Sequence, residues 1–266
     1  YSCNLRSIRR TTHAAGAAGA FLRYIARPQA NPELLAGHMP SDPKAARAWM
    51  DEQERGDRKN ARVIDKIRIA LPRELNEQQR ADLVRDFMAD LTGGRVPWYG
   101  AIHQSGEDAH NPHVHIALRD RDTETGKRIL RLSDNAKDRL KAGLPGPKAV
   151  DWVRGRWEEV CNRALARVGH AARIDRRTLE AQGIDRAPAI HIGPGAARVE
   201  EGVARPKSRP RVNGAGRKID YPRIDQGRTR KERHAEIVEF NLEKSARSAN
   251  PETAARALFE KEQRRK

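Results

Sequence analysis

Three histidines stand at spacings that could build a metal site. Two of them, His113 and His115, lie one residue apart in the stretch HNPHVHIAL, and His103 precedes them in YGAIHQ. Side chains of a strand alternate between its faces, so His113 and His115 point the same way, and the valine and isoleucine beside them point into the core. If the two stretches pair as a hairpin, His103 lies beside His113. Three imidazoles on one face suit a catalytic metal with open coordination positions.

The alternative interpretation is that these histidines are polar groups satisfied by hydrogen bonds in the core. That explanation accounts for a single histidine more easily than for two at i and i+2 with a third on the paired strand. His110 lies in the intervening polar loop, and we do not expect it to be a ligand.

The chain carries a large excess of positive charge. Its 266 residues include 53 Lys and Arg against 36 Asp and Glu, a formal net charge of +17. Such a surface favours nucleic acid as a partner, because contacts with phosphates release counterions. A metal beside it would polarise a phosphate oxygen during phosphodiester chemistry. The nucleophile would be either water or a protein side chain, and the residue pattern alone leaves both open.

Other classes of protein fit the sequence less well. No stretch approaches the roughly 18 apolar residues of a membrane span, and no signal peptide is visible, so we expect a cytoplasmic protein without membrane insertion. Cys3 and Cys161 are isolated and are expected to be ordinary reduced thiols. The first residue is Tyr1 rather than methionine, and we expect the sequence to begin inside a longer chain.

The elements that must position the histidines follow from periodicity and from end signals. Residues 31–60 are polar and contain three prolines, which favours loop and short helix. The other expected elements are strands at 1–7, 61–72, 98–104 and 113–118 and helices at 11–27, from Asn76 to Gly93, at 152–168 and at 228–249. In the helix at 152–168 the apolar stripe is expected to consist of Val153, Trp157, Val160, Cys161, Ala164 and Val168.

Several stretches together resemble one known family. HNPHVHIAL resembles the His-hydrophobic-His signature of the HUH endonucleases. The further stretches FLRYIAR, AGHMP, IALPRELNEQQR and ARIDRRTLEAQGIDRAPAIHIGPGA are similar to the MobA/MobL plasmid mobilisation relaxases, in order and spacing, over about residues 1 to 196. The resemblance implies an α+β fold, with a central antiparallel β-sheet and flanking helices, circularly permuted relative to replication initiators.

The resemblance also implies a reaction. The metal ligands of the family fall on His103, His113 and His115, and its nucleophilic tyrosine falls on Tyr24 in FLRYIAR. Such enzymes nick single-stranded DNA at a transfer origin (oriT), form a 5′-phosphotyrosine and a free 3′-OH, and later reseal the strand. The metal expected is Mn²⁺ or Mg²⁺, and nitrogen ligands favour Mn²⁺. Partners would be oriT DNA, relaxosome accessory proteins and the coupling protein of type IV secretion in a bacterial cytoplasm.

Two points of the site stay open. Without the motif, Tyr24 would be interpreted as an ordinary residue at the edge of the core, and Tyr99, on the histidine face, is the alternative nucleophile. Relatives often carry a glutamate shortly before the ALP turn, whereas this chain has Arg68 there. The general base is therefore unassigned, with Glu74 and Asp120 as candidates without geometric support.

DNA contacts are expected from arginines near the motifs. These are Arg23 and Arg27 beside Tyr24, and Arg173, Arg176 and Arg177 in RIDRRTLEAQGIDR; each could instead be a solvated surface charge. His191 is expected to be structural. We expect a relaxase catalytic domain at 1–196, a basic linker at 197–228 and a basic, truncated helical extension at 229–266.

Three rival functions are considered. A replication or transposition HUH nuclease would carry its tyrosine after the histidines, whereas here Tyr24 precedes them. A non-catalytic DNA-binding accessory protein of a relaxosome would leave the histidines and Tyr24 unexplained. A metallohydrolase that uses water would form no protein–DNA adduct.

Overall fold

The computed structural model describes residues 2–141, 143, 148–190, 192, 211–212, 218–219 and 230–249. Residues 1–176 and 177–266 form two separate compact units. The domain limits predicted at 196 and 228 stay predictions, and His191 and the proposed linker, apart from the short strands within it, lie outside the described residues.

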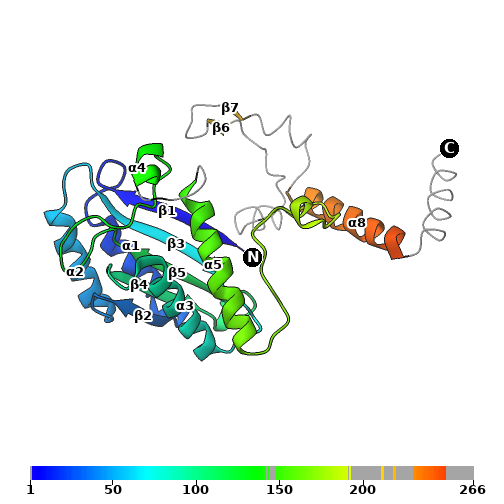
Figure 1. Cartoon of the computed structure of the whole chain (residues 1–266), viewed down its shortest axis with the longest axis horizontal. Helices are drawn as coiled ribbons and strands as arrows, with labels where there is room; N and C mark the ends of the chain where they lie inside the picture. The colour runs from blue at the N-terminus through cyan, green and yellow to red at the C-terminus, as the bar shows by residue number, and fades with distance from the viewer. Residues whose placement is uncertain are drawn as a thin grey trace. The chain divides into compact units, whose positions relative to one another are not determined.

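The first unit is built on one antiparallel five-stranded sheet with the order β1-β3-β5-β4-β2 (Figure 1). Its strands are β1 (Cys3–Arg9), β2 (Glu33–Gly37), β3 (Arg62–Ala70), β4 (Trp98–His103) and β5 (His113–Leu118). Strands β4 and β5 pair in the register that sets His103 opposite His113. The expected α+β class, with a central antiparallel sheet and flanking helices, is confirmed.

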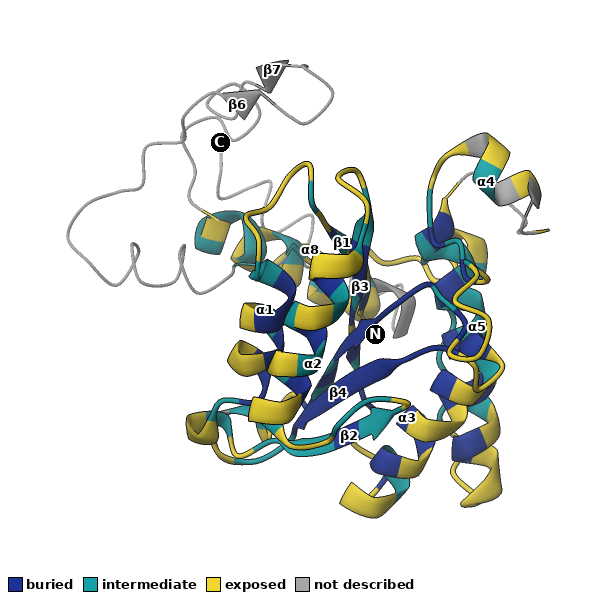
Figure 2. Cartoon of the chain, turned by 90° about the vertical axis from the view of Figure 1, so that its left-hand side faces the viewer, coloured by how far each residue is buried: buried dark blue, intermediate teal, exposed yellow. Residues whose placement is uncertain are grey.

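Helices cover both faces of this sheet. They are α1 (Ala17–Ile25), α2 (Pro43–Gly56), α3 (Glu77–Thr92), α4 (Ala136–Lys141) and α5 (Ala149–Arg167), with short 3₁₀ turns at Pro28–Ala30 and Gly106–Asp108. Figure 2 shows the buried strands between α1 and α2 on one side and α3 and α5 on the other. The second unit contains the 3₁₀ turn Glu180–Gln182, the short pair β6 (Arg211–Val212) and β7 (Lys218–Ile219), and α8 (Arg230–Ala249).

The face under α3 and α5 holds the larger apolar core. Phe87 of α3 meets Trp157 of α5 edge to face, with ring centroids 5.1 Å apart. Helix α3 begins with a capping box, in which Asn76 and Gln79 each accept from the other's backbone N–H, and it ends at Gly93 as expected. These two helices pack against one face of β3 and β5, and the histidines point from the opposite face.

The face under α1 and α2 is divided along its length. At one end Ile8, Ile64 and Ala117 pack beneath the two helices with the buried Tyr99. Toward the other end the same face carries polar side chains, because alternation along the paired strands sets Arg6, Lys66 and Arg68 in line with the histidines. The candidate site residues on this face therefore lie at its polar end, and the other end of the face is core.

Some expected elements were wrong in detail. Residues 31–60 contain the edge strand β2 and the 14-residue helix α2 rather than loop and short helix. The helix expected at 11–27 begins only at Ala17, after Gly16 with a φ of 79°. Val168 is 41% exposed and lies outside the apolar stripe of α5, where Leu165 is buried instead. No helix among the described residues has the length and apolar character that crossing a membrane requires.

Candidate metal centre and nucleophile

The three histidines meet on the polar end of the sheet face. One nitrogen of each lies within 4.8 Å of a nitrogen of the other two, and the ring centroids are 5.0–5.2 Å apart. His103 comes from β4, and His113 and His115 come from β5, as alternation predicts. The convergence expected from the sequence is therefore present in the fold.

Backbone carbonyls select the nitrogen that two of these histidines offer. Nε2 of His103 donates to the carbonyl of Ile25 at 2.8 Å, and Nδ1 of His113 donates to the carbonyl of Asn111 at 2.9 Å. Because a carbonyl only accepts, each ring must carry a proton on that nitrogen, so the neutral form of each ring keeps its lone pair on the other nitrogen. Such outer hydrogen bonds are typical of metal-binding histidines.

The electrostatic environment keeps two of the rings neutral. Burial, and then the charges of His113, His103, Arg68 and Arg27, lower the pKa of His115 to about 3. Burial also lowers the pKa of His103, although its hydrogen bond to Ile25 opposes this shift. A metal ligand must be a neutral imidazole, so these residues fit a divalent metal ion.

Helix α1 carries the candidate nucleophile beside this centre. Tyr24 is 57% exposed, and the next residue, Ile25, supplies the carbonyl bonded to His103. Arg27 lies over the Tyr24 ring, with its guanidinium carbon 4.6 Å from the ring centroid. The end of α1 thus joins an accessible phenol, a cation and the histidine centre.

Tyr99 has a different environment. Its side chain is buried, and its hydroxyl donates to the carbonyl of Ser41 at 3.2 Å. Burial, and then the charge of Asp42, raise its pKa to about 12. A phenol that is buried and difficult to ionise is a poor nucleophile at neutral pH.

The candidates for a general base differ in how close they lie to the histidine centre. Asp120 lies beyond the end of β5 opposite the histidines and forms an ion pair with Arg128 at 2.6 Å. Burial lowers the pKa of Arg80 and raises that of Cys161, and the charge of Glu74 raises both, so this carboxylate lies near those two residues. Asp108, which sequence reasoning missed, has a carboxylate oxygen 3.7 Å from Nδ1 of His103. The available signal was its position in the loop between the two histidine strands.

The predicted DNA-contacting arginines do not form one group. Arg23 is exposed on α1, and Arg27 lies at the end of that helix near the centre. Arg173 donates to the backbone carbonyl of the neighbouring Ala172. Arg176 pairs with Glu158 of α5 at 3.2 Å, so it belongs to the layer on the other face of the sheet. Arg177 belongs to the second unit, where it donates to the carbonyl of Ala181.

Comparison with known proteins identifies the family. The sequence model of the MobA/MobL family matches residues 21–202, so the chain belongs to this family. It is 37% identical to "Mobilization protein A" of Escherichia coli over 62% of this chain and 24% of that protein. It is 34% identical to the "43 kDa relaxation protein" of Salmonella typhimurium over 59% of this chain and 45% of that protein.

The chain spans less than half the length of these two relatives. A solved structure titled "Molecular Basis of Vancomycin Resistance Transfer in Staphylococcus aureus" matches with a TM-score of 0.47 and 19% identity, over 67% of this chain and 98% of that one.

Proposed function

We propose that the chain is the catalytic part of a relaxase that nicks single-stranded DNA at a plasmid transfer origin and later reseals it. The observation that carries this proposal is the hydrogen bond from His103 to Ile25, because it joins the histidine centre to the helix end that bears the exposed Tyr24. Membership in the MobA/MobL family supports the role in mobilisation.

The reaction uses the Tyr24 hydroxyl as nucleophile. Its oxygen attacks the scissile phosphorus, the bond to the 3′ oxygen breaks, and that oxygen leaves as a 3′-OH while the 5′ side stays on the tyrosine. The phosphodiester bond energy is retained in the phosphotyrosine, so a later 3′-OH can reverse the reaction. His103, His113 and His115 would hold a divalent metal, which when bound polarises the phosphate and stabilises its developing negative charge.

Arg27 is suited to hold the substrate during this attack. Its guanidinium lies over the Tyr24 ring and its charge reaches both His103 and His115. A cation at this place offers a hydrogen-bond donor to a phosphate oxygen next to the nucleophile. The three nitrogen ligands favour Mn²⁺ over Mg²⁺.

The rival functions are weaker on this geometry. A water-using metallohydrolase has no use for an exposed tyrosine at the end of the helix that bonds to His103. A non-catalytic accessory protein would leave the histidine cluster without a role. The proposed partners are oriT DNA and the transfer machinery of a bacterial cytoplasm.

An assay with single-stranded oligonucleotides that tile the DNA flanking the gene tests the proposal. With Mn²⁺, we expect a protein–DNA band that survives denaturant and vanishes with EDTA or in His113→Ala/His115→Ala. His110→Ala, in the exposed loop, is the matched control and should keep the band. Cleavage without any adduct would instead assign the nucleophile to water and would contradict the proposed reaction.

A further inference from the structure

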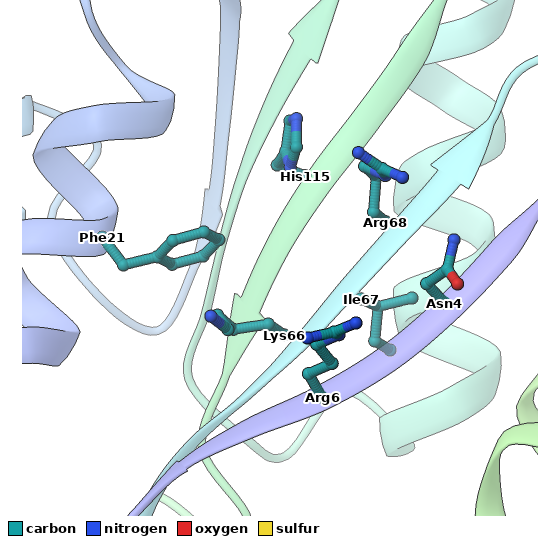
Figure 3. A pocket seen from close by; sticks show the side chains of 7 residues that line it. All are labelled: Asn4, Arg6, Phe21, Lys66, Ile67, Arg68 and His115. Carbon is teal, nitrogen blue, oxygen red and sulfur yellow. The ribbon is translucent and has the colours of Figure 1, made fainter. Parts of the chain in front are cut away.

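A positively charged pocket lies beside the histidine centre. It has a volume of about 270 Å³ and is lined by Asn4, Arg6, Phe21, Lys66, Ile67, Arg68 and His115. Figure 3 shows the side chains of β1, β3 and β5 around it, with Phe21 reaching in from α1. His115 is shared with the proposed metal centre, so the two sites are continuous.

The strand registers arrange these polar groups in order. Arg68 pairs with His115 across β3 and β5, and Asn4 pairs with Arg68 across β1 and β3. Arg6 and Lys66 form the next pair on the same face, two residues or about 7 Å further along the strands. A row of donors therefore leads from the metal centre toward the sheet edge at β1.

The cations of this pocket differ from other basic residues of the first unit in their ionic partners. Among the described residues, none within 4 Å forms an ion pair with Arg6, Lys66 or Arg68, whereas many other arginines of the first unit have acidic partners. The ammonium of Lys66 lies over the Phe21 ring, 4.9 Å from its centroid. Burial and the neighbouring Arg6 lower the pKa of Lys66. Three cations gathered in this way repel one another, and an anion would relieve that repulsion.

We infer that this pocket binds a phosphate of the single-stranded DNA next to the phosphate held at the histidine centre. The inference rests on the proposed function, because it assumes that DNA reaches the histidines. Arg68 lies close to both phosphates, Arg6 and Lys66 hold the flanking one, and Phe21 fixes the Lys66 ammonium in place. The pocket contacts the phosphate backbone of the DNA rather than the edges of its bases, so it positions the DNA strand without selecting its sequence.

The test is the salt dependence of DNA binding by the full chain. The probe is a fluorescent dT20 oligonucleotide, measured by anisotropy in EDTA so that no cleavage occurs. For single strands each phosphate contact contributes about 0.7 to the slope of log K against log salt. Arg6→Gln/Lys66→Gln removes the two cations that hold one phosphate and should therefore lower the slope by about 0.7.

A matched control removes the same charge elsewhere. Lys59→Gln/Lys127→Gln changes two exposed lysines near the end of β3 and β5 opposite the histidines and should leave the slope unchanged. The charge-conserving variant Arg6→Lys/Lys66→Arg, which also controls for folding, should keep the slope of the wild type.

Equal slopes in the pocket and control variants would overturn the inference. That result would leave the proposed function intact, since adduct formation is measured separately. A wild type that forms no adduct would count against the proposed function, whereas the slope difference would still assign a phosphate contact to this pocket.

Discussion

At the residue scale, hydrogen bonds to backbone carbonyls determine which nitrogen of two of the histidines is available to a metal. The carbonyls of Ile25 and Asn111 fix which nitrogen of His103 and of His113 carries the donated proton, so the other nitrogen is the one that can bind a metal. Alternation along the strands predicted which histidines meet. It did not predict these hydrogen bonds, because they depend on where α1 ends and on how the loop before β5 turns.

The low pKa of His115 makes a prediction about stability. The unfolded chain takes up a proton on this residue near pH 6.5, whereas the folded chain keeps it neutral down to about pH 3. The free energy of unfolding of the wild type should therefore fall between pH 7.5 and 5, by about 2 kcal/mol at most from this group. Chemical denaturation of metal-free protein across this range measures the effect.

His115→Gln removes this contribution, so its stability should depend less on pH than that of the wild type. His110→Gln, in an exposed loop, is the control and should follow the wild type. Parallel pH profiles for His115→Gln and the wild type would show that His115 titrates alike in the folded and unfolded chains.

Arg68 makes a second prediction at this scale, for metal affinity. It lies beside His115, where the family resemblance led us to expect a carboxylate, and its charge opposes cation binding. Arg68→Gln should therefore bind Mn²⁺ more tightly, roughly tenfold after solvent screening of the Coulomb repulsion. Calorimetric titration of the DNA-free protein measures this, with Lys59→Gln as control. Unchanged or weaker binding in Arg68→Gln would contradict the claim that the charge of Arg68 weakens Mn²⁺ binding.

At the element scale, the sequence predicted the strands that carry chemistry better than those that support them. β3, β4, β5 and α3 have clear alternation or end signals, and they form where expected. β2 was missed because a five-residue edge strand pairs only with β4 and has a weak pattern. α2 was missed because its buried residues are sparse, namely Ala46, Met50 and Glu54 at four-residue spacing in a polar helix.

The contact between β2 and β4 gives a prediction for stability. Gly37 pairs with Trp98, and a Cβ on Gly37 would lie 2.3 Å from the indole nitrogen and 2.9 Å from a ring carbon. Since a rigid ring cannot yield easily, Gly37→Ala should lower the free energy of unfolding by about 1–3 kcal/mol. Thermal or denaturant unfolding measures this loss.

Gly56→Ala is the matched control, because nothing lies within 4 Å of its added Cβ and its backbone needs no left-handed conformation. We expect it to be neutral or slightly stabilising. Equal losses of unfolding free energy in the two variants would mean that the contact with Trp98 does not exclude a larger side chain at Gly37.

At the scale of the whole molecule, function follows from the division of one sheet face. Core residues under α1 and α2 occupy one end, and histidines and the cations of the pocket occupy the other. The histidine cluster could be predicted from local pattern, whereas the α+β class was implied by the family resemblance. The adjacency of Tyr24 could not, since it depends on the packing of α1 across the sheet, and only the family resemblance pointed to it.

The central claim is that Tyr24 becomes covalently joined to DNA. The most direct measurement compares wild type, Tyr24→Phe and Tyr99→Phe in the oligonucleotide assay with Mn²⁺, followed by peptide mapping of the adduct. We predict a denaturant-resistant adduct on the peptide containing Tyr24 in wild type, and none in Tyr24→Phe. Tyr99→Phe should keep the adduct if it folds. An adduct retained in Tyr24→Phe, or cleavage without any adduct, would contradict the account.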